Sequence, residues 1–218
     1  MPKNTKYDLI IFDWDGTLMD STQHIINCIQ LAIEQLLLPP LSDRTVSNII
    51  GLGLNEAIST LYPDLTEVNR KQLGLNYQQN WLDSPYQAPL FDNATKLIHD
   101  LHQQGYFLGV ATGKSRSGLN KVLESSRLGS LFHASRCVDE CYSKPHPEMV
   151  EQLMSYLGAT PKRTLMVGDT SHDLNMAHNA GADSIAVTHG AHDSKALQAC
   201  KPKYIAKNLH QVQQWLSN

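Results

Sequence analysis

Short apolar runs recur along the chain and alternate with segments of helical periodicity. Most of these runs lack polar alternation, which is typical of strands that are covered on both faces. The expected strands are residues 7–12, 106–111, 163–168 and 184–188, with weaker candidates at 135–138 and 204–206. The pattern therefore predicts a sheet of buried strands.

Amphipathic helices occupy intervals between the later strands. In residues 92–104, apolar side chains recur at positions i, i+3, i+4 and i+7, and Gly105 is a natural helix end. Residues 147–157 repeat this stripe, with a proline in the first turn and Gly158 after the last. This alternation predicts an α/β fold with a mostly parallel, doubly wound sheet.

One long interval breaks the alternation. Between the first strand and the next clear one lie roughly ninety residues of helical pattern, too many for an ordinary strand-to-helix connection. Helical segments are expected at residues 26–36, 42–50, 54–61 and 66–82, and Pro39 and Pro40 end the first of them. We therefore predict an all-helical cap at residues 19–83, inserted into a core formed by residues 1–18 and 84–218.

Length and charge narrow the class of protein. With 218 residues the chain can bury a sizeable core without disulfides or a structural metal, and its four cysteines are scattered. A net charge of -3 and the lack of a Lys/Arg run argue against a nucleic-acid partner. No apolar run reaches membrane-spanning length and no export signal is recognisable, so we expect a soluble cytoplasmic protein. A monomer is the first expectation, with a homodimer as the alternative.

Polar side chains follow several predicted strands at the point where each strand ends. They are Asp13 and Asp15 after the first strand, Thr112 and Gly113 after the second, Lys144 after the third, and Asp169 and Asp173 after the fourth. Ligands of open parallel sheets bind beyond the carboxyl ends of the strands. We therefore expect these acids, the hydroxyl and the lysine to converge on one site.

The acids in this set point to a metal ion. Several carboxylates in one cleft would raise each other's pKa unless a cation offset their charge. Mg²⁺ commonly binds through one or two carboxylates together with a substrate phosphate. Asp13 and Asp169 are the expected carboxylate ligands, supported by the backbone carbonyl of Asp15 and by Asp173 in an outer position.

A phosphate group is the anion that matches the rest of the set. Thr112 offers a hydroxyl, and Gly113 begins a loop whose amides suit anion binding. Lys144 would neutralise the transferring group and keep Asp13 ionised. Since side chains two apart in an extended segment point the same way, Asp13 and Asp15 can face one ligand. In this interpretation Asp13 attacks phosphorus, whereas Asp15 protonates the leaving oxygen and then activates water.

Four segments, "DWDGT", "ATGK", "SKPHP" and "GDTSHD", resemble the four ordered motifs of the haloacid dehalogenase-like superfamily. The chain is most similar to the phosphoglycolate-phosphatase-like branch, which has a helical cap after the first motif. The resemblance implies a Rossmann-like core, Mg²⁺ dependence, an aspartyl-phosphate intermediate and a small phosphorylated metabolite as substrate. It also implies that Asp13 is the nucleophile, Asp15 the acid/base, Thr112 and Lys144 phosphate-binding residues, and Asp169 and Asp173 metal-site residues.

Other functions stay open as alternatives. A phosphomutase of the same superfamily shares the chemistry, although the arginine usual after the cap glycine is absent from "GLGLNEAI". A receiver-type signalling module combines similar residues but is far smaller and has no helical insert. A catalytically idle phosphate-binding protein could carry the same motifs.

Weaker candidates lie outside the four motifs. Gly51, Gly53 and Asn55 could belong to a cap loop that enters the cleft and selects substrate, or to a plain turn between helices. His189 and His192 are expected at the surface rather than in the cleft.

Overall fold

A six-stranded parallel sheet forms the centre of this computed structural model, which describes residues 6–217. Its strands are β1 (Leu9–Phe12), β2 (Phe107–Thr112), β3 (Ala134–Cys137), β4 (Thr164–Gly168), β5 (Asp183–Val187) and β6 (Tyr204–Ala206). All six predicted strands are confirmed, with ends that shift by at most two residues. Residues 1–5 and 218 of the predicted core lie outside the described residues.

The strand order is β3-β2-β1-β4-β5-β6, and each neighbouring pair is parallel. The chain thus starts in the middle of the sheet and winds first to one side and then to the other, which confirms the doubly wound α/β fold. Phe12 at the end of β1 pairs with Val110 of β2 and Val167 of β4. The loops that follow these three strands therefore leave the sheet at the same edge.

Helices cover both faces of the sheet, which explains why its strands are continuously apolar. These helices are α5 (Ala94–Gln103), α6 (Arg116–Ser126), α7 (Glu148–Leu157), α8 (Ser171–Asn179), α9 (Ser194–Ala199) and α10 (Leu209–Leu216), with short 3₁₀ turns at Gly129–Leu131 and Pro161–Arg163. Ile10 and Phe12 of β1 pack on the face covered by α5, α6 and α10, whereas Leu9 and Ile11 pack on the face covered by α7 and α8.

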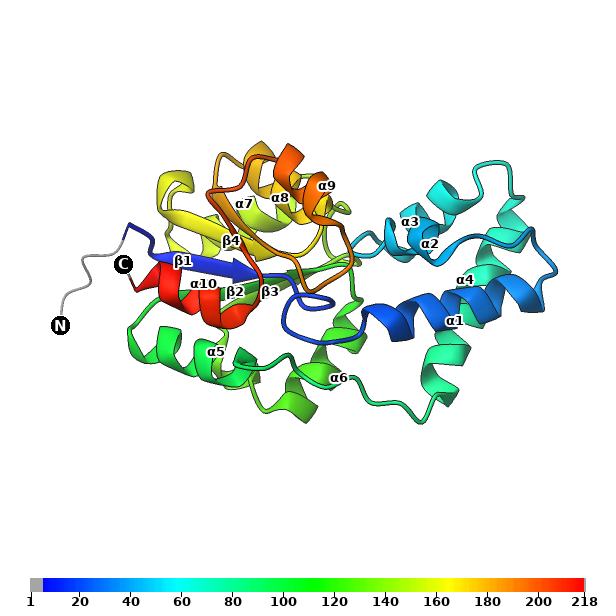
Figure 1. The fold of residues 1–218 in the computed structure, drawn as a ribbon, viewed down its shortest axis with the longest axis horizontal. Helices are drawn as coiled ribbons and strands as arrows, with labels where there is room; N and C mark the ends of the chain where they lie inside the picture. The colour runs from blue at the N-terminus through cyan, green and yellow to red at the C-terminus, as the bar shows by residue number, and fades with distance from the viewer. Residues whose placement is uncertain (1–5, 218) are drawn as a thin grey trace.

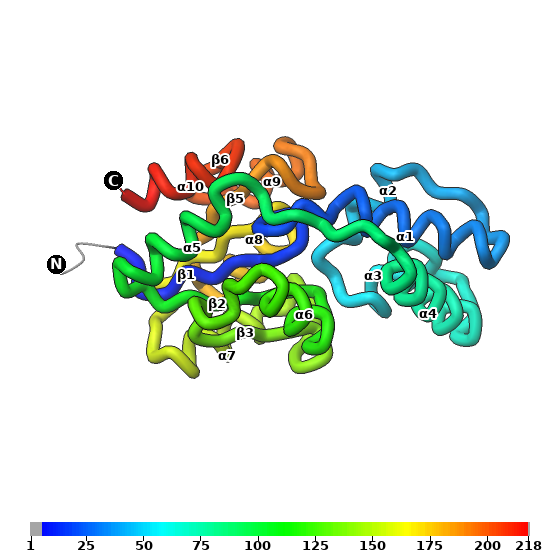
Figure 2. The backbone as a smooth tube through the Cα atoms, turned by 90° about the horizontal axis from the view of Figure 1, so that it is seen from below, coloured from blue at the N-terminus to red at the C-terminus, as the bar shows by residue number. Residues whose placement is uncertain are grey.

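Four further helices stand apart from the sheet. They are α1 (Thr22–Gln35), α2 (Asp43–Ser47), α3 (Leu54–Leu61) and α4 (Glu67–Asp83), and they share a hydrophobic cluster of their own. Both views place them beyond one end of the sheet, whereas the start of β1 and the end of α10 lie at the opposite end (Figures 1 and 2). The predicted helical segments are confirmed as helices; that residues 19–83 act as a separate cap stays a prediction.

The four helices α1–α4 form a helical lobe, and the two segments that connect this lobe to the sheet run side by side. The amide of Asp20 donates to the carbonyl of Pro89 at 2.8 Å, and the amide of Phe91 donates to the carbonyl of Leu18 at 2.9 Å. These bonds hold the lobe close to the end of β1, where Asp13 follows. Within residues 6–217, no helix combines the length and the apolar character needed to cross a membrane.

Candidate active site

A fully buried lysine joins the ends of two central strands. Lys144 comes from the loop after β3, and its Nζ lies 2.7 Å from Oδ1 of Asp13, directly after β1. The same Nζ lies 2.7 Å from Oδ1 of Asp173, in the first turn of the helix after β4. All three side chains are at most 1% exposed. Because buried charges are tolerated only when they are paired, this contact requires the segments after β1, β3 and β4 to meet.

Burial shapes the electrostatics of the cluster. It raises the pKa of Asp13 well above its ordinary value, against the opposing charge of Lys144. Burial and then the charge of Asp173 raise the pKa of Asp169 to about 7. Burial alone would lower the pKa of Lys144, but the charges of Asp13 and Asp173 outweigh it and raise that pKa. Three acids thus share one buried cation, and their excess negative charge matches a divalent metal ion.

The geometry of the acids also fits a metal ion. Asp13, Asp169 and Asp173 each offer a carboxylate oxygen, and these oxygens lie within 4.8 Å of one another. Oδ2 of Asp13 is buried and has no hydrogen-bond partner among the described residues. Leaving such an acceptor unsatisfied costs about 1–3 kcal/mol, so this atom is suited to a ligand. Oδ2 of Asp173 already accepts from the amide and hydroxyl of Thr170, which favours an outer position for this acid.

Asp169 is held by groups from two other loops. The hydroxyl of Thr17 donates to its Oδ1 at 2.7 Å, and the amide of Ala191 donates to its Oδ2 at 2.7 Å. A Cβ at Gly16 would lie 2.3 Å from Oδ2 of Asp169, and Gly16 also has a φ of +79°. Only glycine suits this position, which explains the glycine and threonine that follow the opening acids.

Asp15 lies in a different environment from Asp13. Its Oδ1 accepts from the hydroxyl of Ser21 at 2.6 Å and lies 3.0 Å from Nζ of Lys114. Asp15 and Lys114 are both mostly buried, yet both border the cavity described below. The two neighbouring acids thus have separate cations, an arrangement that lets two carboxylates take different roles.

A loop of the helical lobe touches the end of β2. Thr112 is the last residue of β2, and its hydroxyl accepts from the amide of Lys114 at 3.2 Å. A Cβ at Gly113 would lie 2.6 Å from the carbonyl oxygen of Leu52 and 2.7 Å from that of Gly51. The amide of Gly53 donates to the hydroxyl of Ser143 at 2.8 Å. Of the two interpretations of this glycine-rich loop, the geometry favours the one that brings it into the cleft.

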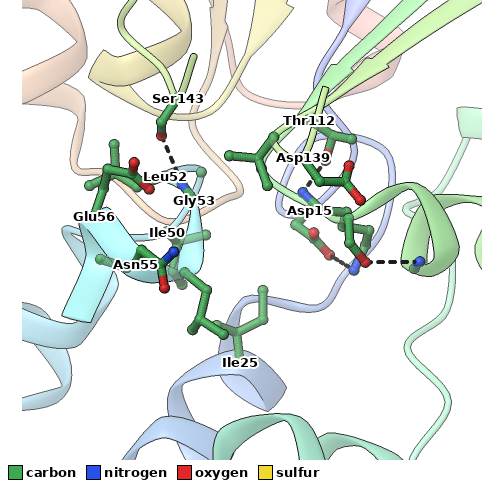
Figure 3. Close-up of a pocket in the computed structure, with 18 of the residues that line it drawn as sticks. Asp15, Ile25, Ile50, Leu52, Gly53, Asn55, Glu56, Thr112, Asp139 and Ser143 are labelled. Carbon is green, nitrogen blue, oxygen red and sulfur yellow. Dashed lines mark hydrogen bonds and ion pairs between the residues drawn. The ribbon is translucent and has the colours of Figure 1, made fainter. Parts of the chain in front are cut away.

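A cavity of about 710 Å³ separates the helical lobe from the sheet edge. Ile25 and Ile50 lie on one side of it, and Asp15 and Thr112 lie on the other (Figure 3). Seven of the predicted site residues line this cavity: Asp13, Asp15, Thr112, Gly113, Gly51, Gly53 and Asn55. The lining does not include Lys144, Asp169 or Asp173. Lys144 is connected to the cavity indirectly, through its bond to Asp13.

Comparison with known proteins supplies the family. A sequence profile described as "Haloacid dehalogenase-like hydrolase" matches residues 10–187, which include all four motifs. The chain belongs to this family. A relative from Dickeya dadantii named "Probable phosphatase IndB" is 36% identical over 209 residues, which cover 94% of this chain and 91% of the relative.

Two further relatives of this hydrolase bear names that specify a substrate. A phosphoglycolate phosphatase from Aliivibrio fischeri is 30% identical over 207 residues, covering 91% of each chain. A crystal structure described as a predicted phosphoglycolate phosphatase from Haemophilus somnus has a TM-score of 0.87 at 26% identity and covers 98% of this chain and 99% of its own.

The surface position expected for His192 in this hydrolase is wrong. Its side chain is 7% exposed, because the loop after β5 folds back over the end of β4. There its Nδ1 accepts from the amide of Ser171 at 3.0 Å, and its Nε2 lies 3.2 Å from the carbonyl oxygen of Asn48. His189 is partly buried, and its Nε2 lies 3.1 Å from the carbonyl oxygen of Thr17.

Sequence reasoning also missed three residues that hold the acids of the site. Thr17 and Ser21 donate to Asp169 and Asp15, and Lys114 pairs with Asp15. Thr17 and Lys114 stand inside quoted motifs, so their places beside the candidate residues were the available signal. Ser21 follows the motif by several positions and carried no signal of its own.

Asp13→Asn is expected to stabilise the metal-free hydrolase at about pH 8, because it removes a buried charge and keeps an acceptor for Lys144. Burial raises the folded-state pKa of Asp13 above its unfolded value. The carboxylate therefore costs stability once pH exceeds the unfolded pKa, and the cost is complete only above the folded pKa. The gain should be larger at about pH 8 than at about pH 4, and each ~1 kcal/mol corresponds to ~2–4 °C in Tm.

Thermal unfolding followed by circular dichroism in EDTA measures this gain. Asp20→Asn, at an exposed neighbouring acid, is the matched control and should leave Tm nearly unchanged. A lower Tm for Asp13→Asn than for the unchanged protein at about pH 8 would show that the ionised carboxylate of Asp13 does not destabilise the folded protein.

Gly113→Ala should displace the loop that contains Gly51 and Leu52, since the new methyl group would overlap their carbonyl oxygens. We expect a loss of about 1–3 kcal/mol in the free energy of unfolding, measured by urea titration. Gly129→Ala is the control: its Cβ would meet its nearest atom at 3.5 Å, an ordinary contact. Equal effects of the two substitutions would contradict the close approach of this loop to Gly113.

Proposed function

We propose that this chain is a Mg²⁺-dependent phosphatase that hydrolyses a small phosphorylated metabolite through an aspartyl phosphate at Asp13. The observation that carries the proposal is the unpartnered Oδ2 of Asp13, buried at the end of β1 and at the edge of the cavity. The phosphatase names of its relatives support the same activity.

In the first step, Asp13 is the nucleophile. Its carboxylate attacks the phosphorus atom, and the bond between phosphorus and the ester oxygen breaks. Asp15, which borders the same cavity, gives a proton to that oxygen, so that the leaving group departs as an alcohol. Lys144 holds Asp13 in place, and Thr112 and Gly113 bind the phosphoryl oxygens at the end of β2.

In the second step, water releases the phosphate. Asp15, now unprotonated, takes a proton from a water molecule whose oxygen attacks phosphorus. The bond between phosphorus and Asp13 breaks, which frees inorganic phosphate and restores the carboxylate. Ser21 and Lys114 keep Asp15 oriented through both steps.

Asp13, Asp169 and the backbone carbonyl of Asp15 would hold the metal ion, with Asp173 as outer support. Bound there, Mg²⁺ would offset the negative charge of the carboxylates and of the transferring phosphoryl group. Thr17 and Ala191 fix Asp169 for this purpose.

The helical lobe at residues 19–83 would serve as a cap over the reaction. Its loop at Gly51 and Gly53 contacts Gly113 and Ser143 of the core, so it already borders the place where the phosphoryl group would bind. Closing such a cap excludes bulk water and selects the leaving group.

Phosphate release from a panel of phosphorylated metabolites tests the activity. The proposal predicts release that requires Mg²⁺, is lost in EDTA, and falls at least about a thousandfold in Asp13→Asn. Full activity of Asp13→Asn would remove Asp13 as the nucleophile. An isomerised phosphate ester in place of inorganic phosphate would identify a phosphomutase instead.

Asp15→Asn tests the acid/base role through the leaving group. Without a proton donor, kcat/KM for alkyl phosphates with poor leaving groups should fall about 10²–10⁴-fold. The fall should be much smaller for p-nitrophenyl phosphate, whose leaving group needs no protonation. Asp20→Asn, at an exposed acid outside the cavity, is the control. An equal fall for both kinds of ester would contradict proton donation by Asp15.

A further inference from the structure

The cavity is larger than phosphoryl transfer requires. Asp13, Asp15 and Thr112 make up only a small part of its lining, which also includes residues of α1, α3, α4 and α6. Its volume of about 710 Å³ lies within the range of roughly 300–1,000 Å³ that is typical of sites for drug-sized ligands. The leaving group of the substrate therefore has room for more than a two-carbon acid.

The charges around the cavity do not favour an anionic leaving group. No arginine is among the described residues that line it, and its lysines are Lys114 and Lys121. Lys114 is paired with Asp15, and Lys121 shares the lining with Glu56 and Asp139. Carboxylates and phosphates are bound in proteins by unpaired cations, above all by the fork of arginine. Against these two lysines the lining carries four acids, Asp13, Asp15, Glu56 and Asp139, and this excess of negative charge disfavours a second anionic group on the substrate.

The wall that belongs to the helical lobe is apolar and aromatic. Ile25, Ile50, Tyr77 and Trp81 all line the cavity. The indole of Trp81 is held in place, because the ring of His24 lies 4.4 Å from it and Nζ of Lys114 lies 4.8 Å from its centroid. Fixed aromatic rings of this kind pack against the faces of other rings.

Two amide side chains add a polar component to this wall. Asn55 and Gln78 line the cavity, and neither side chain makes a hydrogen bond with a described residue. Each amide offers both a donor and an acceptor, which is the pair that a hydroxyl group needs. A cavity wall with apolar faces and uncharged hydrogen-bonding groups suits a ligand whose ring carries hydroxyl groups.

We propose that the substrate is the phosphate monoester of an uncharged, ring-bearing alcohol of the size of a sugar or a nucleoside, with its ring against Trp81. This inference rests on the phosphatase function proposed above and selects among its substrates. It favours sugar phosphates and nucleoside monophosphates over phosphoglycolate and pyrophosphate, whose leaving groups are small anions.

Steady-state phosphate release with Mg²⁺ tests the order of substrates. The panel contains a hexose 6-phosphate, a pentose 5-phosphate, a nucleoside 5′-monophosphate, phosphoglycolate and pyrophosphate, with Asp13→Asn as the blank. We expect kcat/KM for at least one ring ester to exceed that for both small anionic substrates by about tenfold or more. A nucleotide that surpasses the matching pentose phosphate would show that the base is also bound.

Two variants test the walls that carry the inference. Trp81→Leu should lower kcat/KM for the ring esters about tenfold while changing that for phosphoglycolate less than about twofold. Glu56→Lys, which makes the lining more positive, should shift the preference toward phosphoglycolate about tenfold. Glu34→Lys is the matched charge reversal at an exposed site off the cavity and should shift nothing.

The outcomes separate the two proposals. If phosphoglycolate or pyrophosphate is the best substrate and Asp13→Asn abolishes its hydrolysis, the inference about the leaving group is wrong and the phosphatase function stands. If Trp81→Leu lowers the rate for every substrate equally, the indole has only a structural role, which also overturns the inference. If no member of the panel releases phosphate above the blank, both proposals fail.

Discussion

The pairing of one buried lysine with two buried acids is the contact on which the site depends. Nζ of Lys144 bonds to both Asp13 and Asp173, so the segments that follow β1, β3 and β4 meet at a single ammonium group. Removing the lysine would leave the buried carboxylates without an opposing charge, which costs several kcal/mol. Folding of the segments at the carboxyl ends of these strands and assembly of the site are therefore coupled. The negative charge that remains after this pairing is what suits the site to a divalent cation.

The topology of the sheet explains why such distant residues meet. The first strand is central, and its neighbours β2 and β4 are aligned with it so that Phe12 lies beside Val110 and Val167. Each loop at this edge then contributes one kind of group: acids after β1 and β4, and a hydroxyl after β2. The helical lobe is inserted directly after the first acids, so the segment that would select the substrate starts beside Asp13, the proposed nucleophile.

Much of the fold follows from local pattern, whereas part of the site depends on contacts that no local pattern encodes. The strands are predictable because both of their faces are buried, and the convergence of Asp13 and Asp169 follows from parallel pairing. By contrast, Ser21 reaches Asp15, and His192 becomes buried, only after loops fold back on the sheet edge. The helices of the helical lobe are predictable from the periodicity of their apolar residues. The approach of Gly51 to Gly113, by contrast, depends on how this lobe packs against the sheet domain.

Identification of the phosphorylated residue is the most direct test of this account. The protein would be mixed with a ³²P-labelled substrate and Mg²⁺, quenched in acid during turnover, and digested for peptide mapping. The account predicts an acid-stable, hydroxylamine-sensitive label on the peptide that contains Asp13. Turnover without any label on that peptide, or a label on another residue, would contradict it.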